Sequence, residues 1–387
     1  MIIINNKSEC CGCSACVQAC PKQCIRMLTD EEGFWYPYVD MDMCIDCHLC
    51  EKVCPELNIH LNNSLPSVFA AVCDDDYIRM SSSSGGVFTR LAETIINCGG
   101  VVFGACWDKD WTVHHTYATT IDCLEIMRGS KYMQSVIGDS FFQAKAFLRE
   151  GRKVLFSGTP CQIAGLKLYL KKEHENLFTV ECVCQSVPSP GVWKKYLEER
   201  AKQSGHTVSD ILSVKFRNKE SGWKVYSCSI DYKDGTRYLR NKEKDTWMLG
   251  YRDGLITRPS CTQCPSKSSS SMADLSLGDL WGITEIAPDL DDDKGVTSVL
   301  VRTNKGRELL NASKVMILRE LDFNIVAQKN LAITTATGKQ KGRDAFWHNI
   351  NNGRSIIKTI TRMTRHPLKI RLRQTLSRIY RTFIPRK

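Results

Sequence analysis

The sequence predicts a small α+β module at the N-terminus, an α/β body behind it and a basic tail at the C-terminus. Two runs of four cysteines lie within residues 10–54, and strand-like apolar runs alternate with amphipathic helices between residues 61 and 350. Residues 354–387 hold eleven Lys and Arg without one Asp or Glu, which equals the whole net charge of +11. We place the boundaries at residues 1–60, 61–350 and 351–387, and divide the body into residues 65–150 and 151–350.

Each cysteine run reads C-x2-C-x2-C-x3-C-P, which is the spacing of bacterial ferredoxins. Two residues between thiolates point three sulfurs at one 4Fe-4S cluster, while the x3 step begins a helix that turns the fourth toward the other cluster. Zinc sites also use C-x2-C, but zinc explains neither the x3 step nor the proline. We expect cluster one to bind Cys10, Cys13, Cys16 and Cys54, and cluster two to bind Cys44, Cys47, Cys50 and Cys20.

The composition indicates a cytoplasmic protein. The sequence contains no run of 18 apolar residues, so no membrane span is predicted. Residues 1–7 are too short and too polar for a secretory signal. Twenty cysteines, used largely in cluster spacing, favour a reducing compartment. After Pro367, apolar residues at helical spacing predict a basic amphipathic helix, for which association with an anionic membrane surface is one hypothesis. A solvated tail or a helix packed on the body is the alternative, and nucleic-acid binding is disfavoured because no recognised module accompanies the cations.

The body is predicted element by element. It begins with a strand at residues 67–73, a helix at 86–96 and a strand at 101–106. A strand at 153–156 leads into a helix at 162–172, and a strand at 177–184 leads through two prolines into a helix at 192–202. From residue 211 to 240 the apolar period becomes two, which predicts antiparallel strands.

Three features of the body indicate chemistry. Residues 81–86, SSSSGG, open a helix whose free N–H groups attract phosphate, although an ordinary N-cap looks the same. Residues 128–132, RGSKY, place two cations and a phenol beside a glycine. Loops after parallel strands gather at one sheet edge and could unite four further thiols in a third cluster: Cys161, Cys184, Cys261 and Cys264.

The other body cysteines are expected to be small buried hydrophobes, namely Cys73, Cys98, Cys106, Cys123 and Cys228. Cys182 needs a separate decision, because alternation places it on the same strand face as Cys184. We expect only Cys184 to bind the cluster, since it stands at the carboxyl end of the strand while Cys182 lies one pleat deeper.

Seven blocks of the body, in this order, resemble the family of coenzyme F420 hydrogenase/dehydrogenase beta subunits. They are SSSGGVF (82–88), GSKYMQ (129–134), GTPCQ (158–162), CQSVPSP (184–190), FRNKESGW (216–223), CTQCP (261–265) and ADLSLGDLWG (273–282). The resemblance implies an FAD beside a 4Fe-4S cluster held by the four body cysteines. It also implies FAD contacts from Ser84, Gly85, Gly86, Gly129, Ser130, Lys131, Tyr132, Gly158 and Thr159.

The resemblance implies an FAD- and 4Fe-4S-dependent oxidoreductase. Clusters carry single electrons, so a flavin is needed to join them to a two-electron organic substrate. That substrate would be coenzyme F420-like, or a sugar or glycan precursor of a bacterial polysaccharide pathway. The chain has Gln185 and Ser186 where the family usually has His and Gly, and residues 268–271 are serines where basic residues are usual, which favours a substrate other than the archaeal coenzyme.

The alternative function is a non-catalytic electron-transfer subunit of a larger redox complex, whose flavin face docks on a partner protein. The expected partners are therefore a redox protein, such as a ferredoxin, and an organic hydride donor or acceptor. No catalytic residue is predicted by the sequence, and neither is the direction of electron flow, because the surroundings of each cluster set its potential.

Overall fold

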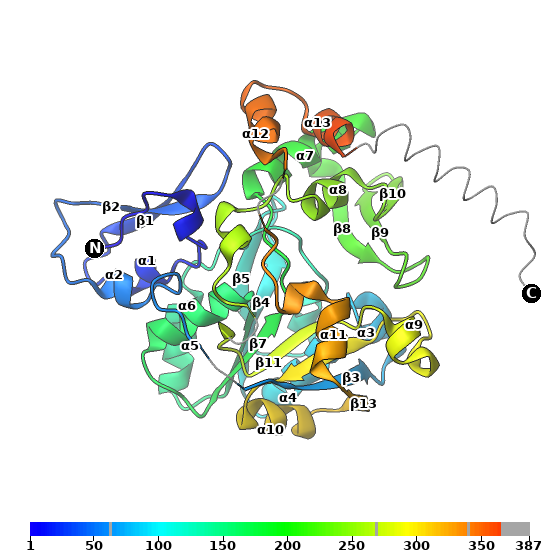
Figure 1. Cartoon of the computed structure of the whole chain (residues 1–387), viewed down its shortest axis with the longest axis horizontal. Helices are drawn as coiled ribbons and strands as arrows, with labels where there is room; N and C mark the ends of the chain where they lie inside the picture. Colours follow the sequence, from blue (N-terminus) through cyan, green and yellow to red (C-terminus); the bar gives the residue numbers. More distant parts are fainter. Residues whose placement is uncertain (62–63, 268–269, 339–340, 365–387) are drawn as a thin grey trace, which may run out of the picture.

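We analysed a computed structural model of the chain, which describes residues 1–61, 64–267, 270–338 and 341–364 (Figure 1). The N-terminal module repeats a cysteine loop and a short helix, with one hairpin between the repeats. Strands β1 and β2 of this hairpin pair antiparallel from Ile25↔Val39 to Thr29↔Trp35. The module is thus the expected α+β unit, consisting of η1 (Lys7–Glu9), α1 (Ala15–Ala19), β1 (Ile25–Thr29), β2 (Trp35–Val39) and α2 (Leu49–Lys52).

An eight-stranded mixed sheet forms the core of the body, in the order β13-β3-β12-β11-β7-β6-β4-β5. Its centre is parallel and comprises β4 (Val101–Trp107), β6 (Val154–Gly158), β7 (Leu177–Cys182) and β11 (Leu275–Asp279). Antiparallel strands flank this centre: β3 (Ser67–Cys73), β5 (Val113–Ala118), β12 (Thr297–Val301) and β13 (Val315–Leu321). The parallel strands therefore bring their carboxyl ends to one edge, where ligands usually bind in open α/β sheets.

Helices cover both faces of the sheet because alternate strand residues are apolar on each face. Phe103 and Phe156 face α5 (Ser140–Arg149) and α6 (Pro160–Leu170), whereas Val102 and Leu155 face α4 (Val87–Asn97) and α10 (Asn304–Ala312). Shorter elements complete this part of the body: α3 (Asp76–Ser81), η2 (Asp122–Met127), α9 (Ile283–Ile286), η6 (Pro288–Leu290), α11 (Phe323–Lys329) and η7 (Leu331–Ile333). Within the described ranges, no helix has the length and apolar character needed to cross a membrane.

A second, three-stranded antiparallel sheet extends the body, as the period of two predicted. It contains β8 (Ile211–Asn218), β9 (Ser227–Tyr232) and β10 (Arg237–Asn241). An aromatic core that includes Trp193, Phe216 and Trp247 joins this sheet to its helices. The 3-10 helix η3 (Val208–Asp210) precedes the sheet, and the helices are α7 (Pro190–Gln203), α8 (Thr246–Arg252), α12 (Arg343–Asn351) and α13 (Ile356–Met363).

The position of α13 corrects the predicted start of the tail. Ile356, Ile357 and Ile360 are buried in the aromatic core, because this helix turns its apolar side toward α7 and α8. Lys358 and Arg362 therefore sit on a helix of the body, and Arg354 lies just before it. The amphipathic helix predicted after Pro367 lies outside the described residues.

Three other expectations were wrong in detail. Strand β7 ends at Cys182, so Cys184 lies in the following loop. Cys98 and Cys123 are exposed, because one caps the end of α4 and the other lies in the surface helix η2.

The N-terminal module docks on the body through close backbone contact and paired charges. A Cβ on Gly33 would lie 2.5 Å from the Cα of Gly191, so the two segments touch at glycines. Arg343 of the body donates to the Glu32 carboxylate of the module. Helix α1 packs beside α6, and a Cβ on Gly165 would lie 3.0 Å from the Cys13 sulfur. The docking thus brings the first cysteine run against the helix that carries Cys161 (Figure 1).

Candidate redox site

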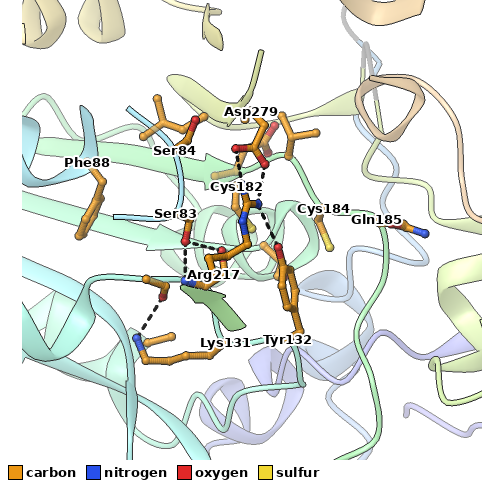
Figure 2. A pocket seen from close by; sticks show the side chains of 18 of the residues that line it. Ser83, Ser84, Phe88, Lys131, Tyr132, Cys182, Cys184, Gln185, Arg217 and Asp279 are labelled. Carbon is orange, nitrogen blue, oxygen red and sulfur yellow. Dashed lines mark hydrogen bonds and ion pairs between the residues drawn. The ribbon is translucent and has the colours of Figure 1, made fainter. Parts of the chain in front are cut away.

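A cavity of about 530 Å³ opens at the carboxyl edge of the parallel strands. Its size falls within the range of ~300–1,000 Å³ that small-molecule and cofactor sites occupy. The walls come from the serine loop before α4, the loop at residues 128–132, the ends of β6, β7 and β11, and the second sheet with α8. Figure 2 shows how side chains from these separate segments converge on one space.

Eight of the nine residues expected to contact FAD line this cavity: Ser84, Gly86, Gly129, Ser130, Lys131, Tyr132, Gly158 and Thr159. Gly85 is not among the lining residues. Its N–H donates to the Thr297 hydroxyl at 2.9 Å, and a Cβ there would lie 2.7 Å from the Ala71 carbonyl oxygen. Gly85 is thus required for packing of the loop on the sheet, behind the cavity wall.

The serine loop and the loop at residues 128–132 are joined to each other. The Ser83 hydroxyl accepts from the N–H of Ser130 at 2.7 Å and lies 2.8 Å from the Ser130 hydroxyl. Gly86 has a φ of +81° as the N-cap of α4, whose first residues, Val87 and Phe88, line the cavity. The first turn of a helix leaves N–H groups without intrahelical partners, so this wall can bind phosphate.

Lys131 supplies positive charge on the same side of the cavity. Its ammonium donates at 3.3 Å to the carbonyls of Met127, Arg128 and Gly129. Burial lowers the pKa of Lys131 to about 8, while Cys106 opposes this shift. An ammonium held by carbonyls in a desolvated site gains most from an anionic ligand.

Arg217 and Asp279 form the opposite wall, and no sequence pattern indicated either as a site residue. The guanidinium donates two hydrogen bonds to the Asp279 carboxylate, at 2.7 and 2.9 Å, and one to the Tyr132 hydroxyl at 3.3 Å (Figure 2). Burial opposes the charge of Arg217, but Asp279 keeps its pKa well above the usual value. Nearby, the half-buried ammonium of Lys242 lies 5.1 Å from the ring centre of Trp281.

The four cysteines proposed for the third cluster meet beside the cavity. Cys161 lies in the first turn of α6, Cys184 follows β7, and Cys261 and Cys264 lie in and after η4 (Pro259–Gln263). Burial and the thiols of Cys161 and Cys184 raise the pKa of Cys264 to about 12. Burial, followed by Cys184, also raises the pKa of Cys261. Cys184 itself lines the cavity, so a cluster on these thiols would adjoin it.

The ferredoxin thiols gather in two places. Burial, followed by Cys10 and Cys54, raises the pKa of Cys16, so residues from both runs meet at the first group. The second group consists of Cys20, Cys44, Cys47 and Cys50, which line a small cavity. Cys24 lines it too, and its sulfur is 3.3 Å from that of Cys20. Across the described residues, no three His, Cys, Asp or Glu side chains are placed to hold a single metal ion.

Comparison with known proteins identifies both parts. Residues 9–57 match the 4Fe-4S dicluster domain, and residues 151–322 match the C terminus of the coenzyme F420 hydrogenase/dehydrogenase beta subunit. The resemblance to these beta subunits is confirmed. The chain is thus an iron-sulfur electron-transfer protein that has a ferredoxin module and is related to the coenzyme F420 hydrogenase/dehydrogenase beta subunits.

The comparison also finds individual relatives. The chain is 23% identical over 318 residues to a subunit of the F(420)H(2) dehydrogenase of Methanosarcina mazei, covering 77% of this chain and 80% of that protein. It is 42% identical over 53 residues to a 7Fe ferredoxin of Hydrogenibacillus schlegelii, covering 14% of this chain and 62% of the ferredoxin. A structure of the F420-reducing [NiFe] hydrogenase complex from Methanosarcina barkeri contains a similar chain, with a TM-score of 0.47, 18% identity, and coverage of 69% of this chain and 87% of that one.

Two further cysteines of this protein lie close to the predicted ligands. Cys182 is the last residue of β7 and pairs with Leu277, so it lies deeper in the sheet than Cys184, as expected, but it is exposed and also lines the cavity. The Cys11 thiol contacts Cys13 of the module and Cys161 of the body. Cys13 and burial raise the pKa of Cys11 well above its usual value, while Cys161 opposes this shift. No spacing signal distinguished Cys11, because its role depends on how the two domains dock.

Proposed function

We propose that the chain is an iron-sulfur flavoprotein oxidoreductase with FAD in the cavity and a third 4Fe-4S cluster beside it. One observation carries this proposal: Cys184 belongs at once to the four-thiol group and to the cavity wall, while Cys11 joins that group to Cys13. A continuous row of thiols therefore leads from the module to the cavity. FAD would supply the exchange between a hydride and single electrons that such a row requires.

The residues of the cavity fit this cofactor in their chemistry. The first turn of α4 and the Lys131 ammonium would hold its phosphates. Gly158 and Thr159, at the end of β6, would let the ring lie close to the thiols. Cys161, Cys184, Cys261 and Cys264 would hold the third cluster, and the two ferredoxin groups would hold the others.

The substrate is an organic hydride donor or acceptor that enters beside Arg217 and Lys242. It would be coenzyme F420-like, or a sugar or glycan precursor. Asp279 balances Arg217 and Glu243 balances Arg252, so among the described residues Lys242 is the cation of this wall without an ion pair, which favours a substrate that carries an anionic group.

A non-catalytic electron-transfer subunit is the second candidate, and the name of one relative, which is one subunit of a dehydrogenase, favours it. Both candidates require a redox partner protein. The purified chain alone distinguishes them: an enzyme oxidises a reduced deazaflavin or nicotinamide with a dye as acceptor, and a non-catalytic subunit does so only with its partner present.

The cofactor content is tested by anaerobic purification followed by iron, sulfide and flavin assays. Three clusters require about 12 iron atoms per chain, accompanied by one FAD. Eight iron atoms would remove the third cluster, and absence of flavin from protein refolded or reconstituted with FAD would remove the proposed chemistry.

We also propose a cytoplasmic location with peripheral membrane attachment through residues 365–387, which carry eight Lys and Arg. Removing these residues should weaken binding to vesicles that contain anionic lipid and reduce its salt dependence, while dye-linked activity stays unchanged. Failure of the full chain to bind such vesicles would contradict the attachment.

A further inference from the structure

Arg258 occupies the junction between the ferredoxin module and the four body thiols. Its side chain is fully buried, with 0% of its surface exposed. Nε donates to the Cys10 carbonyl at 2.7 Å, and Nη2 donates to the Trp35 carbonyl at 2.9 Å. The backbone of Arg258 belongs to the loop of the body that carries Cys261, because the Arg258 carbonyl accepts from the N–H of Cys261 at 3.1 Å. One residue thus connects the loop of cluster one to the loop of the third cluster.

Gln134 and Gly12 complete this junction. Nη1 of Arg258 donates to the Gln134 side-chain carbonyl at 2.9 Å. The Gln134 amide nitrogen donates in turn to the Gly12 carbonyl at 3.3 Å. A Cβ on Gly12 would lie 2.2 Å from the Gln134 amide nitrogen and 2.9 Å from Nη1 of Arg258. The first cysteine loop is therefore pressed directly onto the guanidinium, and a larger residue at position 12 has no room.

The charge of Arg258 lies near the cluster thiols and near the carboxyl of Glu56. Its three hydrogen-bond partners are two backbone carbonyls and an amide, so none of them neutralises the guanidinium. Burial opposes its charge, yet its pKa is raised, because Cys10, the ring of Tyr36, Cys11 and Cys261 lie near it. Cys10 acts more strongly than Cys261, in accord with the direct hydrogen bond to the Cys10 carbonyl.

We propose that Arg258 is a positioning residue that couples cluster one to the third cluster, holding their loops together and raising the reduction potential of cluster one more than that of its neighbour. The inference rests on the proposed third cluster. Reduction adds negative charge to a cluster, and a nearby buried cation stabilises the reduced form. The transfer itself moves one electron between the clusters and makes or breaks no bond.

The test compares Arg258→Met, Arg258→Lys and the control Arg200→Met in the anaerobic full-length protein, with redox titration followed by electron paramagnetic resonance. Arg200 is also buried, but its guanidinium packs on Tyr196 and Tyr238 in the aromatic core beside the second sheet. We expect Arg258→Met to keep its iron and to lower the potential of cluster one, changing the electron equilibrium between the two clusters about tenfold, or ~59 mV for one electron. Arg258→Lys should restore the potential, and Arg200→Met should leave it unchanged.

Unchanged potentials in Arg258→Met, with 12 irons retained, would overturn the inference. If Arg258→Met fails to assemble its clusters, Arg258→Lys still decides, because a lysine keeps the charge but cannot reach Cys10, Trp35 and Gln134 together. The magnetic coupling between cluster one and the third cluster should then weaken, and unchanged coupling would overturn the inference. A wild-type protein with only eight irons would instead defeat the proposed function, so the two failures are distinguishable.

Discussion

The thiol group proposed for cluster two and the one proposed for the third cluster lie at opposite ends of the row of thiols and face different surroundings. The group for cluster two includes the exposed Cys47 and lies beside Met41, Met43 and Ile45, each more than half exposed. The group for the third cluster lies between the docked module and the cavity, and Cys184 faces the cavity. One end of the thiol row is therefore suited to contact another protein, and the other end to contact a small molecule. The same ligand type would serve both purposes, because the surroundings of each thiol group decide what a cluster bound there could reach.

The largest effect should come from removing a thiol of the group beside the cavity. Cys184→Ala should remove about four iron atoms per chain and stop electron flow between the module and the flavin, because four thiolates hold a 4Fe-4S cluster of this type. Cys182→Ala is the matched control, since this neighbour also faces the cavity but should leave the iron content intact. Iron assays and stopped-flow reduction with dithionite measure both variants, and loss of iron from Cys182→Ala alone would reverse the assignment.

The next largest effect should be on FAD content, and two glycines offer a matched pair of substitutions to test it. Gly129 and Gly151 have φ values of +85° and +77°, and a Cβ at either would meet no atom within 4 Å. Only Gly129 lines the cavity. Gly129→Asp should thus lose FAD through repulsion of its phosphates, while Gly151→Asp should retain it and carry the same backbone strain. Equal flavin content in the two variants would contradict FAD binding at this wall. Gly86→Asp is less suitable, since its Cβ would lie 3.0 Å from that of Cys73.

The same two regions show what the sequence could predict. The ferredoxin thiols follow from local spacing, since the cubane geometry constrains residues only two or three positions apart. The cysteines after β6 and β7 were predictable because parallel strands end at one edge, and the serine loop was predictable because small residues there open a helix. Cys11 and Arg258 were not, because their contacts arise from docking of residues far apart in the chain. Gly85 was misassigned for a related reason: a glycine needed for packing and one needed for a ligand look alike in sequence.

Lys131 predicts a smaller, pH-dependent effect at the cavity end. Burial lowers its pKa to about 8, so its charge, and with it FAD affinity, should decline by about tenfold as the pH rises from about 7 to about 9. The flavin-free protein should show the opposite trend in stability: above about pH 8 the unfolded chain still binds this proton while the folded chain does not, so stability rises with pH. FAD titrations at both pH values should show no such slope for Lys131→Met, whereas Lys145→Met on α5 should behave as the wild type. A persistent slope in Lys131→Met would assign the titration to another group.

The smallest effect should come from the exposed end. Charge at a protein-docking surface changes association more than chemistry, so the double variant Met43→Glu with Ile45→Glu should slow electron uptake from a reduced ferredoxin by roughly fivefold. Reduction by dithionite, which needs no docking face, should stay unchanged. Leu212→Glu is the control, because this residue is 59% exposed on β8, outside the module. Equal slowing with both reductants would mean that the substitutions damaged cluster two itself. Equal slowing in Leu212→Glu would instead show that added negative charge anywhere repels the carrier, and the two ends would then no longer be distinguished by docking.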